Sequence, residues 1–162
     1  MKIIAYTKNG VPVFSHDEAH PHRMDLAEES IGMLTVPETP ADPADRSQTR
    51  HCEVLDMGRV IGKNHLVETE EDDAVFFAKR DDRPYPSRMV LTETADETRL
   101  TVVLFYAEGK WILWTNYEGE DGLPEVGCDR YNNGTPEFQQ KCREFWATHA
   151  LVPNENEILI IV

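Results

Sequence analysis

The segment 74–88, AVFFAKRDDRPYPSR, concentrates positive charge in an acidic chain. It holds four of the sixteen basic residues of a protein whose formal net charge is -14. Guanidinium groups bind phosphate or carboxylate through paired N–H donors, and a neighbouring serine hydroxyl adds a further hydrogen bond. The segment therefore predicts an anion-binding turn. Its expected ligand-binding residues are Arg80, Arg83, Ser87 and Arg88.

The same segment has an alternative interpretation, in which nearby carboxylates neutralise it. Asp81 and Asp82 lie inside the segment, and the acidic run ETEEDD (68–73) precedes it. Exposed ion pairs of this kind are common and contribute little free energy. The sequence leaves both interpretations open. They differ in whether the guanidinium groups face a ligand or face these acids.

A second candidate lies at the end of an expected strand over residues 110–117. Thr115 and Tyr117 flank Asn116, so they share one face of the strand. A glycine-rich segment follows, and such strand ends often carry binding sites. Thr115 is therefore expected to assist catalysis and Tyr117 to contact a ligand. An ordinary exit from strand to turn is the alternative.

Two histidines are candidates for proton transfer. His65 follows a glycine turn, and His149 lies near Trp146 on the expected apolar stripe of the last helix. Imidazole is a general acid or base near neutral pH, whereas a structural histidine hydrogen-bonds to backbone or to a carboxylate. The cluster of His16, His20 and His22 is interrupted by a proline and matches no tetrahedral ligand scheme, so neither a metal nor a cofactor is predicted.

The elements that must position these residues indicate an α+β fold. Asn9-Gly10 and Glu108-Gly109 have the composition of tight hairpin turns. Thr135, Pro136 and Glu137 are typical of a helix start. We predict a mostly antiparallel sheet of about six strands with two packed helices. Strand candidates are 2–6, 11–14, 53–61, 74–79, 87–93, 98–107, 110–117 and 157–162, and the helices are 22–33 and 135 to about 150.

The length and hydrophobic content predict a single domain over residues 1–162. It comprises a hairpin and helix (1–34), a proline-rich loop (35–52), and a sheet core with the C-terminal helix (53–162). No apolar run is long enough to cross a membrane, and the N-terminus lacks a signal-peptide pattern. The three cysteines have no C-x-x-C spacing, which fits a reducing compartment. A cytoplasmic protein is therefore expected.

The excess of acidic residues argues against some classes of function. Thirty acidic residues against sixteen basic ones argue against general binding of nucleic acid or anionic membranes. The chain also lacks the Walker, G-x-G-x-x-G, H-E-x-x-H and G-x-S-x-G motifs. We therefore expect an acidic binding protein of unknown partner, whose exterior engages a basic protein or mimics the charge of nucleic acid. The alternative is an enzyme or binder that acts on a small phosphate-containing ligand through the arginine turn.

Residues 58–151 resemble a group of uncharacterised bacterial and phage proteins. The resemblance rests on an R-x-x-R turn, an S-R-x-V strand start, a later T-x-x-x-G strand end and the helix motif FWATHAL. Asn116 departs from the alanine of that pattern. The resemblance implies no established activity. The matching residues are Arg80, Arg83, Ser87, Arg88, Thr115, Gly119, Phe145, Trp146 and His149.

A more distant likeness is to barnase, EndoU and RelE-like ribonuclease toxins. These proteins place a histidine or lysine before a small antiparallel sheet that presents Arg and Ser or Thr to a phosphate. His65, Arg83, Arg88 and Thr115 occur in that order here. The likeness implies a ribonuclease-like fold in which the arginines stabilise phosphate charge and a histidine transfers protons.

Overall fold

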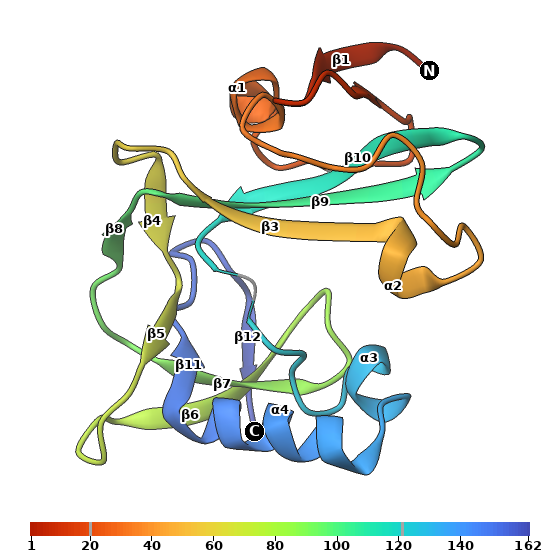
Figure 1. Cartoon of the computed structure of the whole chain (residues 1–162). Coiled ribbons are helices and arrows are strands. Elements are labelled where there is room, and N and C mark those ends of the chain that lie inside the picture. Colours follow the sequence, from red (N-terminus) through yellow and green to blue (C-terminus); the bar gives the residue numbers. More distant parts are fainter. Residues whose placement is uncertain (20, 121) are drawn as a thin grey trace. The chain divides into compact units, whose positions relative to one another are not determined.

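The computed structural model describes residues 1–19, 21–120 and 122–162, and it divides into two compact units (Figure 1). The first unit contains residues 1–62 and 97–120, and the second contains residues 63–96 and 121–162. Each unit is thus assembled from two separate stretches of chain. The expectation of a single domain stays a prediction, because two compact units can belong to one domain. His20 lies outside the described residues.

The first unit is built on a five-stranded sheet. Its strands, in spatial order, are β1 (Ile3–Tyr6), β2 (Pro12–Phe14), β10 (Lys110–Glu118), β9 (Arg99–Ala107) and β3 (Arg50–Asp56). The two expected hairpins are confirmed: β1 pairs with β2 across Asn9-Gly10, and β9 pairs with β10 across Glu108-Gly109. Glu108 and Gly109 both have positive φ, as a two-residue turn of this composition requires, and Gly10 has positive φ in the longer turn between β1 and β2. Only β2 and β10 pair in parallel in this sheet.

The predicted helix over 22–33 is much shorter in the structure. A 3-10 turn, η1 (Met24–Leu26), leads into one short helix, α1 (Ala27–Ile31), and a second short helix is α2 (Arg46–Thr49). The chain leaves α1 at Gly32, and this brings Leu34 and Val36 into the same core as the helix. Burial of these apolar side chains outweighs continuation of the helix. The core is formed by Val11, Val13, Leu26, Ala27, Ile31, Leu34, Val36, Leu55, Met57, Leu100, Val102, Leu104, Trp111 and Leu113.

A β-bulge in β10 changes the expected alternation of side chains. Leu113 pairs with Leu104 of β9, whereas the next paired residue, Thr115, faces Val103. Trp114 is therefore an extra residue, and the strand beyond it is shifted by one position. Asn116 consequently takes the core face instead of Thr115, which corrects the simple alternation expected from the sequence. Thr115 and Tyr117 still share a face, opposite the core.

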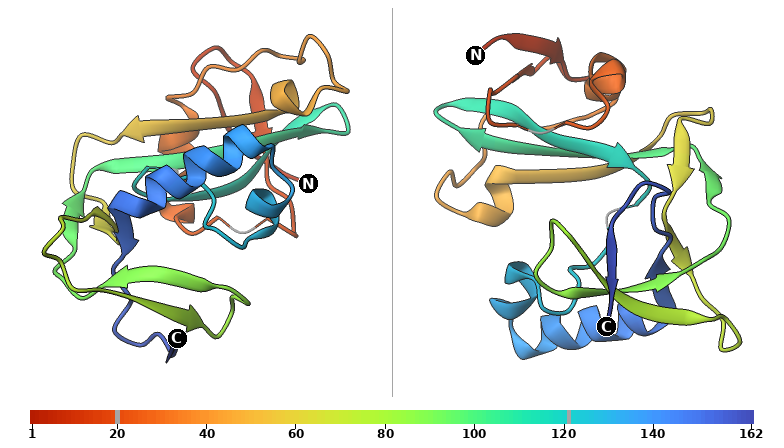
Figure 2. Two further views of the ribbon diagram at one scale, coloured as in Figure 1. Left: turned by 90° about the horizontal axis from the view of Figure 1, so that it is seen from below. Right: turned by 180° about the vertical axis from the view of Figure 1, so that it is seen from behind.

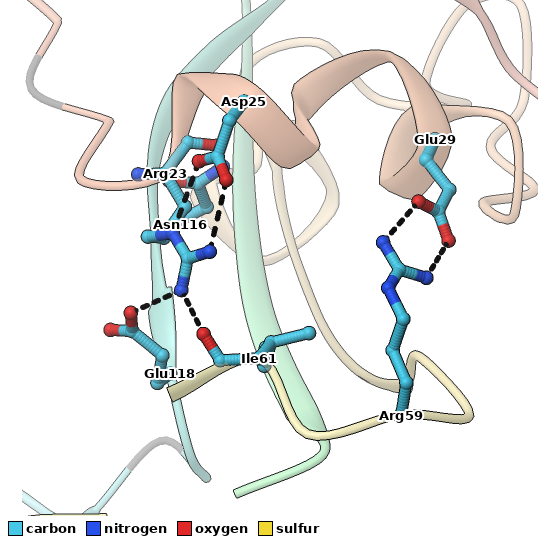
Figure 3. Close-up of polar contacts among 7 residues, drawn as sticks. All are labelled: Arg23, Asp25, Glu29, Arg59, Ile61, Asn116 and Glu118. Carbon is cyan, nitrogen blue, oxygen red and sulfur yellow. Dashed lines mark hydrogen bonds and ion pairs between the residues drawn. The ribbon is translucent and has the colours of Figure 1, made fainter. Parts of the chain in front are cut away.

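Asn116 joins β10 to the segment before η1 (Figure 3). Its side chain is 0 % exposed. Oδ1 accepts a hydrogen bond from the backbone N–H of Arg23 at 2.7 Å, and Nδ2 donates to the carbonyl oxygen of Arg23 at 2.9 Å. The carbonyl oxygen of Asn116 accepts a third bond from the backbone N–H of His22 at 3.1 Å. The oxygen and the nitrogen of the buried side-chain amide therefore each have a hydrogen-bond partner in the segment before η1.

The guanidinium group of Arg23 is neutralised in the same place (Figure 3). It donates to both carboxylate oxygens of Asp25, at 3.0 and 2.9 Å, to Glu118 at 2.5 Å, and to the carbonyl oxygen of Ile61. The bonds to Asp25 and Glu118 raise the pKa of Arg23, and the bond from Arg23 lowers the pKa of Asp25. This cation is fully engaged, so the cluster is structural and does not form a ligand site.

The second unit is built on another five-stranded sheet. Its strands, in spatial order, are β12 (Leu159–Ile161), β6 (Val75–Arg80), β7 (Pro86–Val90), β11 (His149–Leu151) and β5 (Leu66–Glu68). All neighbours are antiparallel except β7 and β11. The helices of this unit are α3 (Asp129–Asn132) and α4 (Pro136–Thr148). A separate two-stranded sheet pairs β4 (Gly62–Asn64) with β8 (Ala95–Glu97).

Helix α4 begins where the sequence predicts and ends earlier. The hydroxyl of Thr135 caps it by accepting a hydrogen bond from the N–H of Phe138 at 3.2 Å, and Pro136 is the first helical residue. The helix ends at Thr148, and the chain continues directly into β11 (Figure 2). His149 is therefore a strand residue that pairs with Glu68 of β5, and its expected place on the helix is wrong. Pairing with β5 supplies the backbone hydrogen bonds that a further helical turn would have made.

The α+β class and the mostly antiparallel pairing are confirmed. The described residues form twelve strands in three sheets and four α-helices, so the expected six strands and two helices are wrong. The missed strands β4, β5, β8 and β11 have three residues each, which is too short for an alternating pattern to show. Among the described residues, no helix has the length and apolar character needed to span a membrane.

We expect Asn116→Ala to destabilise the protein by about 2 kcal/mol, because it removes a fully buried amide and leaves the half-buried backbone N–H and carbonyl group of residue 23 without these partners. Urea-induced unfolding followed by circular dichroism measures the loss. Asn133→Ala is the matched control, because Asn133 is exposed and its midpoint should not move. Equal midpoints for the two variants would contradict the role of Asn116.

The carboxylate of Glu97 makes the stability of the fold depend on pH. This carboxylate is 3 % exposed, and it accepts hydrogen bonds from the backbone N–H groups of Thr98 and Arg99 and from the Arg99 guanidinium. Burial alone would raise the pKa of Glu97, but the bonds from Arg99 and the backbone outweigh it, and the pKa lies below the usual 4.5. Because the pKa of Glu97 is lower in the folded protein than in the unfolded chain, its ionised carboxylate stabilises the fold at pH values above 4.5. This stabilisation is lost as the pH falls through the pKa of the folded state.

The expected result is therefore a drop in the urea midpoint on acidification from neutral pH to below pH 4.5, with a smaller drop in Glu97→Gln. The variant keeps the shape of the side chain and removes its titration. If both proteins lose the same stability over this range, the carboxylate of Glu97 does not contribute as stated.

Candidate anion-binding site

Arg80, at the end of β6, is neutralised inside the second unit. Its Nη2 donates to Glu125 Oε1 at 2.8 Å and to Ser87 Oγ at 3.1 Å, and Ser87 Oγ donates to the other oxygen of Glu125. The side chains of Arg80 and Glu125 are each 15 % exposed. Nε of Arg80 lies 3.9 Å from Glu157, beyond hydrogen-bond distance. Of the four ligand-binding residues expected within segment 74–88, Arg80 and Ser87 are thus bound to a carboxylate from outside the segment.

Arg83 lies in the exposed turn between β6 and β7. The register pairs Ala78 with Ser87 and Lys79 with Pro86, so the two strands form a hairpin with Arg83 at its tip. Its Nη1 lies 3.6 Å from Asp82 Oδ2, and the side chain is 45 % exposed. This is the arrangement of the alternative interpretation, in which an adjacent acid screens the arginine.

Arg88, on β7, has a different environment. Its Nη1 donates to Thr69 Oγ1 and to the carbonyl oxygen of His149, both at 2.9 Å. Within the described residues, no carboxylate lies at ion-pair distance from Arg88. The neutral partners fix the position of the guanidinium group and leave its charge uncompensated. Arg88 is therefore the residue of the segment that is best suited to hold an anion.

A cavity of about 320 Å³ lies beside Arg88 and receives a second arginine, from α4. Arg143 donates to the Tyr131 hydroxyl and to Gln140 Oε1, both at 2.7 Å, and it too has no ion-pair partner in the described parts of the chain. The sequence reasoning missed Arg143. Its spacing from Trp146 and Ala147, three and four residues later on one helix face, is the signal that points to it. The cavity is lined by Phe77, Pro86, Arg88, Glu125, Val126, Arg143, Trp146 and Ala147.

Glu125 is the one acidic residue in this lining, and its charge is already compensated. Arg80 binds one carboxylate oxygen and Ser87 binds the other. The remaining charges at the cavity are the two guanidinium groups of Arg88 and Arg143. The rest of the wall is largely apolar, and Phe77 is 50 % exposed. The cavity therefore offers positive charge beside an apolar surface.

The two candidate histidines are both hydrogen-bonded to the backbone. His65 Nδ1 bonds to the carbonyl oxygen of Val152, and His149 Nδ1 bonds to that of Phe145, each at 2.9 Å. A carbonyl oxygen only accepts, so each Nδ1 carries the proton. The ring of His149 also stacks on Phe145 at a centroid distance of 4.0 Å. Neither imidazole lines the cavity of Arg88 and Arg143. Their catalytic role stays a prediction.

Thr115 and Tyr117 belong to β10 of the first unit, whereas the arginines belong to the second. A joint site made from both groups also stays a prediction. In the described ranges, no group of three or more His, Cys, Asp or Glu is placed to hold a metal ion, and His20 of the histidine cluster is not among the described residues. Cys142 is buried, and burial raises the pKa of its thiol, which disfavours the reactive thiolate.

Comparison of the chain with protein-family models, curated proteins and solved structures gives no match. The resemblances drawn from the sequence therefore stay predictions. The chemistry of the site follows from its own residues.

We expect Arg80→Ala to destabilise the protein by about 2–3 kcal/mol, because it leaves the largely buried carboxylate of Glu125 without its cation. Arg83→Ala is the matched control from the same turn and should leave the urea midpoint unchanged. An Arg80→Ala variant as stable as Arg83→Ala would show that Glu125 does not need this partner.

Proposed function

We propose that this protein binds a small organic anion, in which a phosphate group is joined to an apolar or aromatic body. The proposal is carried by one observation. Arg88 and Arg143 line the same cavity, and neither has a carboxylate partner among the described residues. Arg88 is half-buried and Arg143 is exposed, so both guanidinium groups are accessible at the cavity and their charge is not neutralised by a carboxylate.

The cavity wall supports the choice of ligand. Guanidinium groups bind phosphate oxygens through paired, charge-assisted hydrogen bonds. Phe77, Val126 and Trp146 supply an apolar surface next to those donors. The volume, about 320 Å³, is at the lower end of the range of small-molecule pockets. A compact monophosphate ester therefore fits better than a polymer.

Binding is favoured over catalysis because the cavity lacks a free acid or base. Glu125 is held by Arg80 and Ser87, and the rings of His65 and His149 are not part of the lining. The ribonuclease-like alternative keeps Arg88 as a phosphate contact and requires one of these histidines to reach the ligand. A general acid or base must come within hydrogen-bond distance of the reacting group.

The test is calorimetric titration of the whole protein with phenyl phosphate, compared with inorganic phosphate and with phenol. We expect phenyl phosphate to bind more tightly than either, because only it uses both the charge and the apolar wall. Arg143→Ala should weaken this binding roughly 10- to 100-fold, the loss of one charge-assisted contact, and Arg143→Lys should weaken it less.

Arg130→Ala is the charge-matched control, since Arg130 is exposed on α3 and does not line the cavity. It should leave the affinity unchanged. An equal loss in Arg130→Ala and Arg143→Ala would reduce the effect to overall charge. If the parent protein shows no heat with phenyl phosphate and no thermal shift in its presence, the proposal fails.

The second candidate is an acidic interaction protein in the cytoplasm that binds a basic protein. Its support is the excess of thirty acidic over sixteen basic residues, together with the free thiols of Cys52, Cys128 and Cys142, which suit a reducing compartment. Acidic surfaces attract basic partners and speed their association at low salt. An aromatic groove in the first unit, lined by two carboxylates, supports this candidate.

A further inference from the structure

We propose that an aromatic groove in the first unit binds a lysine or arginine side chain from a basic peptide segment of a partner protein. The groove has a volume of about 430 Å³ and is formed by the β9–β10 hairpin and the chain that follows β2. This inference rests on the second candidate function in its choice of partner, and it is independent of the anion cavity. The residues that carry it are Glu18, Phe105, Glu108, Ile112 and Trp114.

The floor of the groove is aromatic because Phe105, which pairs with Ile112 of β10, lies beside Trp114, and all three residues line the groove. Trp114 is the extra residue of β10, has no partner in β9, and is 38 % exposed. Its ring meets Phe105 edge-on, with the centroids 5.8 Å apart and the planes at 87°. The exposed indole face is a surface on which a cation or a guanidinium plane can rest.

The indole N–H of Trp114 is also available. Trp111 Nε1 donates to the carbonyl oxygen of Pro37, and Trp146 Nε1 donates to that of Leu123, so the other two tryptophans are satisfied. Trp114 makes no such bond with the described residues. An amphipathic ring with an apolar face and a free donor is typical of an anchor for a peptide.

Two carboxylates stand at this aromatic surface. Glu18 and Glu108 both line the groove, both are exposed, and neither has an ion-pair partner in the described ranges. His16 also contributes to the lining, and its Nδ1 accepts a hydrogen bond from the backbone N–H of Glu18 at 3.0 Å. The groove therefore carries negative charge beside an aromatic floor.

This combination selects a basic side chain. Aromatic rings attract cations through their faces, and carboxylates at the edge supply the opposite charge. The molecule already contains one such contact nearby, since Lys110 Nζ lies 5.3 Å from the ring centroid of Phe14. An acidic peptide would meet repulsion from Glu18 and Glu108, and a purely apolar segment would leave both carboxylates without a partner.

The experiment is calorimetric titration of the whole protein with the peptide acetyl-Gly-Arg-Leu-Arg-Gly-amide and with its counterpart that has glutamate in place of arginine. Only the basic peptide should bind, and salt should weaken it. We expect Trp114→Ala to reduce the affinity about tenfold or more and Trp114→Phe to reduce it less. The double variant Glu18→Gln, Glu108→Gln should lose about as much, because it removes the charge and keeps the side-chain shape.

The double variant Glu28→Gln, Glu38→Gln is the charge-matched control, because both residues are exposed in the same unit and neither lines the groove. It should leave peptide affinity unchanged. If the two neutralised acids at Glu28 and Glu38 weaken binding as much as the two at the groove, the attraction is only general acidity and the proposal is overturned. Absence of binding by the parent protein, or unchanged binding in both Trp114→Phe and the double glutamine variant of the groove, overturns it as well.

The two proposals fail separately. Arg143→Ala lies in the other unit and should leave peptide binding unchanged, whereas the double glutamine variant of the groove should leave phenyl phosphate binding unchanged. A basic peptide that binds normally to a protein without phosphate binding supports the groove alone.

Discussion

The single extra residue in β10 is the constraint on which the first unit depends. Because Trp114 is unpaired, the strand beyond it changes face, and Asn116 enters the core instead of Thr115. There its amide holds both backbone groups of Arg23. Trp114 itself stays on the face of Ile112, and both residues line the groove. One local irregularity thus attaches the N-terminal segment to the sheet.

In the second unit, strand register decides which arginines are neutralised. Arg80 and Ser87 reach the same carboxylate of Glu125, so a charge that looked available is used to hold the hairpin. Arg88 instead contacts only neutral oxygens, of Thr69 and of the His149 backbone. An arginine with neutral partners is held in position, but no carboxylate neutralises its positive charge. The distinction between a structural and a binding arginine therefore lies in its partners and not in its place within the basic segment.

Structural features that depend on adjacent residues could be predicted from the sequence, whereas features that depend on contacts between distant residues could not. The hairpin turns at Asn9-Gly10 and Glu108-Gly109 and the cap of α4 at Thr135 each depend on a few adjacent residues, and all three are confirmed. The end of α4, by contrast, depends on pairing between His149 and Glu68, far apart in the chain. The same holds at the site. Glu125 and Arg143 come from segments that carry no basic pattern, so only the fold brings them to Arg80 and Arg88.

The strong negative charge of the chain affects the two proposed sites in opposite ways. At the groove, the mean field and the local carboxylates both attract a basic peptide, so added salt weakens every part of that attraction. At the cavity, the mean field repels the phosphate while the two guanidinium groups attract it at short range. Salt screens the distant repulsion at least as well as the close contacts, because screening grows with separation. Phosphate binding should therefore depend on salt much less steeply than peptide binding, which separates local anion recognition from general electrostatic attraction.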